Sequence, residues 1–211
     1  MIEIFPGVFK SEQGILTKAL DNKQVYSEKF VGAYRTWNPR RSKPAAAILC
    51  GLKAFPVKPR DKILYLGAGN GTTASHFSDV VGKEGVVYCV EFSARTMREL
   101  IEVCERRKNM VPILADANFP EEYAYVGMVD VVYQDVAQKN QGEIFISNCK
   151  KFLRGGGSGV LMVKARSVDV VMEPKDVYSR VQGKVAKELK VKESLELEPY
   201  ERDHCCIVVE K

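Results

Sequence analysis

The feature that most constrains this chain is a regular alternation of strand-like and helix-like segments from about residue 60 onward. Short runs rich in Val, Ile and Leu, such as residues 63–66 and 86–92, are separated by longer amphipathic stretches, such as residues 72–81. Helices that connect parallel strands cover both faces of the sheet, so the strands between them are apolar on both sides. The alternation therefore predicts an α/β fold built on a mostly parallel sheet.

The same alternation continues to the end of the chain. Further strands are predicted at residues 111–115, 129–133 and 160–163, and further helices at residues 94–108, 144–153 and 175–189. The run Gly155-Gly156-Gly157 is predicted to end the helix before it. Two closing strands, residues 191–197 and 206–209, have no helix between them. The prediction is a Rossmann-like sheet of about seven strands, mostly parallel, with an antiparallel edge strand.

The first part of the chain has a different character. Residues 1 to about 36 are predicted to form short strands and turns, with a hairpin turn at Asp21-Asn22 before the apolar piece Gln24-Val25-Tyr26. So small a region is expected to pack against the rest of the chain. Pro44 suits the first position of a helix that an alanine run continues. We expect two parts: residues 1–56, a small β region with a linking helix, and residues 57–211, the main domain.

The composition is that of a globular protein in a reducing compartment. A chain of 211 residues with 45% hydrophobic residues can bury one substantial core. None of the six cysteines forms a C-x-x-C pair, so buried free thiols are expected. No apolar run approaches the ~20 residues that span a bilayer, and the start Met1-Ile2-Glu3-Ile4 does not resemble a signal peptide. We expect a soluble, intracellular protein without membrane contacts.

Polar residues and glycines follow the predicted strands at the points where these end. The first strand is followed by the glycine-rich run of residues 67–71, the second ends at Glu91, the third at Asp116 and the fourth at Asp135. In open α/β sheets, ligands bind beyond the carboxyl ends of the strands. Glycine lets the backbone pass close to a ligand, and a carboxylate such as Glu91 can accept hydrogen bonds from both ribose hydroxyls of an adenosine. The four strand ends together predict a nucleoside site.

The details distinguish this site from a dinucleotide or triphosphate site. The G-x-G-x-x-G pattern needs a third glycine where this chain has Thr72, and no Gly-Lys-Ser/Thr follows. Acidic strand ends suit a cationic sulfonium cofactor better than a pyrophosphate. Taken singly, the glycines could simply form a turn and Glu91 could simply cap a strand. Their common position at one edge favours a nucleoside.

Six further segments carry a more specific pattern along nearly the whole chain. They are Tyr34-Arg35-Thr36-Trp37-Asn38-Pro39 with Ser42-Lys43, Tyr65-Leu66-Gly67 with Gly71-Thr72-Thr73-Ala74-Ser75-His76, Tyr88-Cys89-Val90-Glu91-Phe92, Ala115-Asp116-Ala117-Asn118, Tyr133-Gln134-Asp135-Val136-Ala137-Gln138 and Tyr200-Glu201-Arg202-Asp203-His204. In this order they resemble the fibrillarin family, methyltransferases that use S-adenosylmethionine (SAM) on RNA ribose 2′-hydroxyls. The loop departs from the family at Gly69-Asn70, where Ala-Ser is usual, and again at Lys139-Asn140.

The resemblance implies a fold, a cofactor and site residues. The fold is that of SAM-dependent methyltransferases, and no metal is implied. The implied catalytic set is Lys43, Asp135, Lys164 and His204. The implied SAM-binding residues are Gly67, Thr72, Thr73, Glu91, Phe92, Asp116, Ala117, Asp135, Val136, Ala137 and Gln138.

This catalytic set suits methyl transfer to a hydroxyl. Asp135 can orient the hydroxyl and accept its proton, although a free carboxylate with a pKa near ~4 is a weak base on its own. Lys43 and Lys164 can stabilise the developing oxyanion, and His204 can contact the nucleotide or relay a proton. Without the family pattern, Lys43 would more simply begin a helix, whereas Lys164, at the carboxyl end of a strand, could equally be a functional charge or part of a solvated edge. His76 is expected to be structural.

The resemblance also implies partners. They are a box C/D guide RNA, the target RNA, a kink-turn-binding protein and a Nop-family scaffold protein. The targets are rRNA, with tRNA as a further candidate, and an archaeal-type chain without a nucleolar tail is expected in the cytoplasm. Two rival functions remain open: a methyltransferase of a protein or small molecule, and a non-catalytic particle subunit with a SAM-binding fold.

Basic residues form several clusters in a chain whose net charge is only +5. These are Arg40-Arg41-Lys43, Arg106-Arg107-Lys108, Lys150-Lys151-Arg154 and residues 184–192. Any such cluster is most simply a solvated face, and phosphate attraction is additive and sensitive to salt. The first cluster adjoins the predicted site and is expected to touch RNA.

Overall fold

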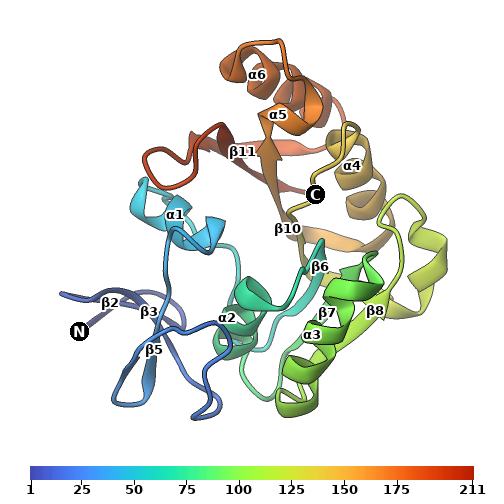
Figure 1. Cartoon of the computed structure of the whole chain (residues 1–211). Helices are drawn as coiled ribbons and strands as arrows, with labels where there is room; N and C mark the ends of the chain where they lie inside the picture. Colours follow the sequence, from blue (N-terminus) through green and yellow to red (C-terminus); the bar gives the residue numbers. More distant parts are fainter.

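The computed structural model describes all 211 residues and contains two sheets, a large one and a small N-terminal one (Figure 1). The large sheet has seven strands in the order β11-β12-β10-β9-β6-β7-β8. Its strands are β6 (Lys62–Leu66), β7 (Val86–Glu91), β8 (Met110–Leu114), β9 (Val129–Gln134), β10 (Leu153–Lys164), β11 (Lys190–Glu196) and β12 (His204–Glu210). The pairs between β10, β9, β6, β7 and β8 are all parallel, so the predicted fold class is confirmed.

The antiparallel edge that the closing strand pair predicted is confirmed. β12 pairs antiparallel with both β10 and β11, so β11 is the outermost strand. The burial patterns explain the order. In β12 every residue from His204 to Val209 is buried, as a strand covered on both faces requires, whereas β11 alternates half-buried and exposed residues, as an edge strand does.

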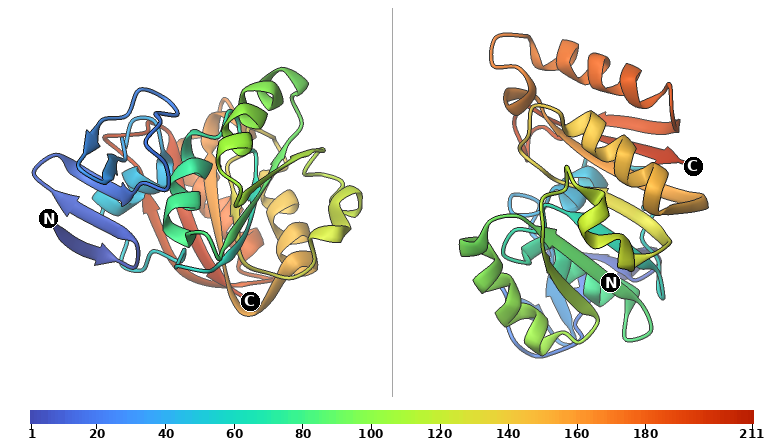
Figure 2. Two further views of the ribbon diagram at one scale, coloured as in Figure 1. Left: turned by 90° about the horizontal axis from the view of Figure 1, so that it is seen from below. Right: turned by 90° about the vertical axis from the view of Figure 1, so that its right-hand side faces the viewer.

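Helices cover both faces of the large sheet (Figure 2). α1 (Lys43–Leu49), α2 (Thr72–Val81) and α3 (Ala94–Arg106) pack on one face, and η1 (Pro120–Val126), α4 (Gln141–Phe152), α5 (Ala165–Val168) and α6 (Pro174–Val185) pack on the other. A hydrophobic core lies on each face of the large sheet, and successive residues of a strand point alternately into one core and the other. In β6, Ile63 and Tyr65 join the first core, and Leu64 and Leu66 join the second.

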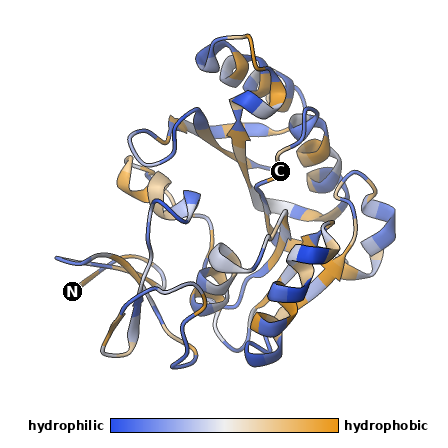
Figure 3. Ribbon diagram, in the orientation of Figure 1, coloured by the Kyte–Doolittle hydropathy of each residue, from blue (hydrophilic) through white to orange (hydrophobic).

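Figure 3 shows the same division by hydropathy, with apolar residues along the strands and charged ones on the outer faces of helices such as α3. In α3 the buried residues Met97, Leu100, Val103 and Cys104 recur at helical spacing. No helix has the length and apolar character needed to cross a bilayer.

The N-terminal sheet is antiparallel and packs on α2. Its strands, in the order β1-β2-β3-β5-β4, are β1 (Ile2–Phe5), β2 (Val8–Ser11), β3 (Gly14–Lys18), β4 (Phe30–Val31) and β5 (Tyr34–Thr36). Val8 and Ile15 belong to the same core as Phe77 of α2. The predicted hairpin into residues 24–26 is wrong: these residues form no strand, because the Glu28 carboxylate accepts the amide N–H groups of Val25 and Tyr26 and holds a turn.

The glycine run of residues 155–157 lies within β10, not between a helix and a later strand. α4 ends at Phe152, and β10 begins at Leu153 with an irregular register before Ser158. The space around the strand requires small residues. A Cβ at Gly157 would lie 2.9 Å from the Asp130 carbonyl oxygen, and one at Gly159 would lie 2.7 Å from the Phe145 ring. Gly157 therefore lets β10 approach the backbone of β9, and Gly159 lets α4 pack closely on the sheet.

Candidate active site

The glycine loop after β6 brings the backbone against the end of β9. Gly67, Gly69 and Gly71 all have positive φ, at 78°, 56° and 88°. A Cβ on Gly67 would lie only 2.4 Å from the Asp135 carbonyl oxygen, so no other residue fits there. The Gly67 and Ala68 amides both donate to the Val90 carbonyl and fix the loop beside β7.

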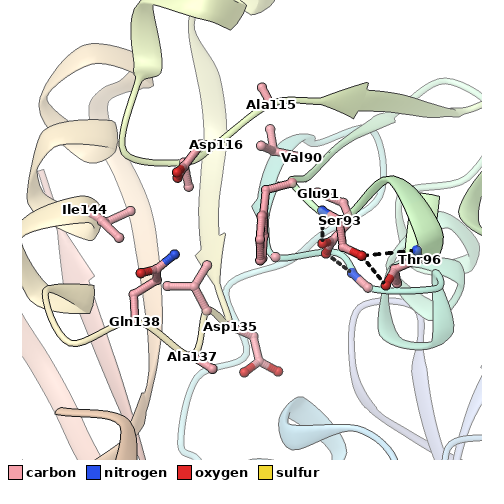
Figure 4. A pocket seen from close by; sticks show the side chains of 15 residues that line it. Val90, Glu91, Ser93, Thr96, Ala115, Asp116, Asp135, Ala137, Gln138 and Ile144 are labelled. Carbon is pink, nitrogen blue, oxygen red and sulfur yellow. Dashed lines mark hydrogen bonds between the residues drawn. The ribbon is translucent and has the colours of Figure 1, made fainter.

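The Glu91 carboxylate is held in place at the end of β7. One oxygen accepts the Gly69 amide at 2.9 Å and the other accepts the Ser93 amide at 2.9 Å (Figure 4). The residue is only 7% exposed, and each carboxylate oxygen can still accept a further hydrogen bond. Glu91 is therefore oriented before any ligand arrives.

A cavity of about 440 Å³ lies at this edge of the sheet. Its lining includes nine of the predicted cofactor-binding residues, namely Gly67, Glu91, Phe92, Asp116, Ala117, Asp135, Val136, Ala137 and Gln138. It also includes six residues outside the predicted cofactor-binding set, namely Gly69, Val90, Ser93, Thr96, Ala115 and Ile144. Three carboxylates line the cavity and no lysine or arginine does, which gives it an acidic character.

Thr72 and Thr73 are not among the residues that line this cavity. Thr72 Oγ1 donates to Asn70 Oδ1 within the loop. Thr73 Oγ1 is 2.8 Å from Ser42 Oγ, which accepts the Trp37 indole N–H at 2.7 Å. These buried hydrogen bonds link the start of α2 to Ser42, the residue before Lys43. Thr73 therefore helps to position α1.

Lys43 and Asp135 form an ion pair beside the cavity. Lys43 is the first residue of α1, and Asp135 directly follows β9. The Lys43 Nζ donates to Asp135 Oδ2 at 2.7 Å, and the two side chains are 18% and 22% exposed. Asp135 Oδ1 accepts no hydrogen bond from the protein, so one carboxylate oxygen is free toward solvent.

His204 and Lys164 face each other on β12 and β10 as register partners, each at the terminus of its strand. His204 Nδ1–H donates to the Arg202 carbonyl at 2.6 Å, which leaves Nε2 as an acceptor in the neutral ring. Burial lowers the pKa of His204, and the nearby Lys43 charge lowers it further. Lys164 is exposed and has no ion-pair partner, so its ammonium group is available.

Comparison with known proteins identifies this arrangement. The fibrillarin family matches the chain over residues 2–211. The chain belongs to the fibrillarin family. The fibrillarin-like rRNA/tRNA 2′-O-methyltransferase of Thermococcus onnurineus is 54% identical over 218 residues, which cover 98% of this chain and 96% of that protein.

Two solved fibrillarin structures agree with the fold. The Aeropyrum pernix fibrillarin, described as a complex with natively bound S-adenosyl-L-methionine, has a TM-score of 0.89 and 44% identity over 99% of this chain and 96% of that one. A fibrillarin/Nop5p complex contains a chain with a TM-score of 0.95 and 40% identity, with both chains fully covered. The large sheet is therefore the SAM-dependent methyltransferase fold of the fibrillarin family.

Ser93 and Thr96 line the cavity and were not predicted, although the sequence around them has a helix-capping pattern. Ser93 lies between β7 and α3, and its hydroxyl accepts the Thr96 amide and the Thr96 hydroxyl. Serine directly before a helix is a common N-cap. The Glu91-Phe92-Ser93 run thus places a capped helix start at the cavity, and that pattern could have identified both residues.

Proposed function

We propose that this chain is a SAM-dependent 2′-O-ribose methyltransferase that acts on rRNA, with tRNA as a further substrate, as the catalytic subunit of a box C/D guide-RNA particle. The name of the Thermococcus relative supports the reaction and the substrate class. The observation that carries the proposal is the Lys43–Asp135 pair, which lies beside an acidic nucleoside-sized cavity with His204 close by.

The cavity suits SAM. Glu91 has acceptor capacity for ribose hydroxyls, and Asp116 Oδ2 takes no protein donor, because both bonds from Asn118 go to Oδ1. The absence of lysine and arginine from the lining suits a cationic sulfonium. Bound there, SAM supplies an electrophilic methyl group; Glu91, Phe92, Asp116 and the glycine loop would hold it.

The remaining residues prepare the attacking hydroxyl. The free Oδ1 of Asp135 accepts the hydrogen bond of a ribose 2′-hydroxyl and orients it, while the Lys43 charge stabilises the oxygen as its proton leaves. His204 Nε2 is the available neutral base for that proton. Lys164 adds positive charge from the adjoining strand end.

The two parts of the chain divide this work. Residues 1–56 contribute Lys43, and residues 57–211 contribute the cofactor site with Asp135, Lys164 and His204. Neither part contains an RNA-recognition module, so a guide RNA, a kink-turn-binding protein and a Nop-family scaffold select the target. The fibrillarin/Nop5p complex of a relative supports the scaffold partner. The proposal places the particle in the cytoplasm of an archaeal-type cell.

The decisive measurement is single-turnover ribose methylation in the reconstituted particle at saturating SAM. Asp135→Ala and Lys164→Ala should each lose about 10²–10⁴-fold in rate, as general acid–base and oxyanion contributions do. Lys187→Ala, which removes another exposed lysine charge away from the site, serves as the control. A near-normal rate in either site variant would show that residue to be structural.

A further inference from the structure

The large sheet is incomplete beside the last residues of β10, next to the candidate active site. β9 and β10 pair as far as Gln134 and Leu161, and there β9 ends. The chain then leaves the sheet, and residues 135–138 line the cofactor cavity. On its other side, β10 stays paired with β12 as far as Lys164. Residues 162–164 therefore have no strand beside them on the β9 side.

The side chain of Gln141 fills this open position. Gln141 is the first residue of α4 and is 0% exposed. Its Oε1 accepts the backbone N–H of Lys164 at 2.9 Å, and its Nε2 donates to the Lys164 carbonyl at 3.2 Å. A carboxamide offers the same donor and acceptor as a peptide group. The Gln141 side chain thus takes the place of a neighbouring strand for Lys164.

Two further hydrogen bonds fix this carboxamide and connect it to the rest of the site. Nε2 also donates to the Gln138 carbonyl at 3.0 Å, so a rotation of the amide by 180° would set Oε1 against two carbonyl oxygens. Gln134 Nε2 donates to the Gln141 backbone carbonyl at 2.6 Å. Gln134 directly precedes Asp135, and Gln138 lines the cofactor cavity (Figure 4). Gln141 therefore links the Lys164 backbone to both of these segments.

The alternation of side chains along β10 shows what this hold on the backbone controls. Met162 belongs to the core on the α1 face and Val163 to the opposite core, so alternation directs Lys164 to the α1 face. Lys43 begins α1, and His204, the register partner of Lys164, is directed to the same face. A turn of the Lys164 backbone would swing its ammonium group away from these residues.

We propose that Gln141 is a positioning residue for methyl transfer, which holds the Lys164 backbone so that the ammonium group faces the acceptor hydroxyl. The inference rests on the proposed function, because it requires Lys164 to act in that reaction. Gln141 is not among the residues that line the cofactor cavity, so it acts through Lys164. An apolar residue of the same length would fill the space and leave the Lys164 N–H without its acceptor.

The test is single-turnover ribose methylation by Gln141→Met in the reconstituted particle at saturating SAM. Methionine matches glutamine in length and makes none of these side-chain hydrogen bonds. The rate should fall roughly ten- to hundredfold, as expected when a charged group near the reacting atoms is misplaced. Gln141→Asn is a milder second variant. It keeps a carboxamide in the buried site but is too short to reach both backbone groups of Lys164, so it should be slowed as well.

Asn109→Leu is the matched control for the loss of a buried carboxamide. Asn109 is buried directly before β8, at the opposite end of the sheet from the cofactor cavity. Like Gln141, it accepts one hydrogen bond, from the Ser78 hydroxyl, and donates two, to the Ser78 and Gly82 carbonyls. Both Asn109→Leu and Gln141→Met should lower the denaturation midpoint. Asn109→Leu should keep the wild-type methylation rate, and equal slowing of the two would overturn the proposal.

A double variant shows whether Gln141 acts through Lys164. Gln141→Met/Lys164→Ala should be no slower than Lys164→Ala alone, because no ammonium group remains to be positioned. Losses that multiply would overturn the proposal. A weaker SAM affinity by calorimetry, with a wild-type rate at saturation, would overturn it too.

The same measurements separate this proposal from the proposed function. A wild-type rate in Gln141→Met and Gln141→Asn beside a slow Lys164→Ala overturns the positioning role alone. A wild-type rate in Lys164→Ala removes Lys164 from the mechanism and the positioning role with it.

Discussion

Ion pairs occur in two regions of this molecule, and the regions differ in how many partners each carboxylate has and in how buried the pairs are. Under the N-terminal sheet, Arg35 pairs with Glu28 and with Asp79, and all three side chains are 0% exposed. At the carboxyl edge of the large sheet, Lys43 pairs with Asp135, and both side chains remain partly exposed. In the first region Arg35 lies between two carboxylates, and the second region has a single ion pair.

The number of hydrogen-bond partners distinguishes a structural carboxylate, Asp79, from a candidate reacting carboxylate, Asp135. In the buried cluster, Asp79 accepts hydrogen bonds from Arg35, Arg107, Thr17 and the Leu20 amide, so both oxygens are used. Such a group fastens the N-terminal sheet to α2 and has no capacity left for a substrate. Asp135 keeps one oxygen free and lies beside a cavity. Incomplete pairing at an accessible position is what a reacting group needs.

The largest expected effect is on stability, from the buried cluster. Asp79→Ala would leave Arg35 and Arg107 buried with fewer partners, which should cost about 3–5 kcal/mol of unfolding free energy. Chemical denaturation of this variant and of Glu105→Ala, an exposed control on the neighbouring helix, measures the cost. The control should change by less than about 0.5 kcal/mol. A cost near the control value would mean that the cluster does not hold the sheet in place.

This cluster also marks where sequence reasoning fails. The alternation of strands and helices predicted the large sheet because hydrophobic periodicity is local. Arg35 and Asp79 are 44 residues apart in the sequence, and no local sequence pattern predicts that they pair. The order of β11 and β12 does not follow from the sequence pattern for a related reason. Two strands without a helix between them can occupy either position, and burial on both faces decides for β12.

The candidate site was easier to predict, because strand ends converge in any parallel sheet. Glu91, Asp116 and Asp135 follow successive strands and line one cavity, as expected. Thr73 does not line it, because its hydroxyl is used by Ser42. That hydrogen bond depends on how α1 packs against α2, which the local pattern does not encode.

Glu91→Ala should weaken SAM binding by about 1–3 kcal/mol, since the ribose hydroxyls lose their acceptor and the Gly69 and Ser93 amides lose theirs. Calorimetric titration of the isolated chain measures the affinity, and Glu99→Ala on the exposed face of α3 is the matched control. Wild-type affinity in Glu91→Ala would remove this carboxylate from the cofactor site.

The buried cluster should also make stability depend on pH. His76 lies within it, 2.6 Å from the Tyr26 hydroxyl, and burial lowers the pKa of His76 well below its usual value, with the Arg35 and Arg107 charges adding to the effect. Below about pH 6.5 the unfolded chain therefore binds a proton that the folded chain does not. Stability should be full above that pH and fall as the pH drops, by up to about 1.4 kcal/mol per unit.

Denaturation of wild type and His76→Gln between about pH 7 and pH 5.5 checks this slope. His204, the other histidine, has a lowered pKa as well, so the variant should keep only its share of the slope. Equal slopes in the two proteins would show that His76 accepts a proton in the folded state.

The smallest expected effect is on stability, from breaking the partly exposed Lys43–Asp135 pair. Lys43→Met breaks the Lys43–Asp135 pair, but both groups reach water, so Asp135 is not stranded as Asp79 would be. Partly solvated pairs contribute about 1 kcal/mol or less, so the unfolding free energy should hardly change. Arg35→Met, the matched change in the buried cluster, should cost several times more. Denaturation of both variants, with methylation measured on Lys43→Met, should show an intact fold and a slowed reaction. If Lys43→Met lost as much stability as Arg35→Met, the Lys43–Asp135 pair would hold the fold together as the buried pairs do. The free oxygen of Asp135 would then no longer distinguish a reacting pair from a structural one.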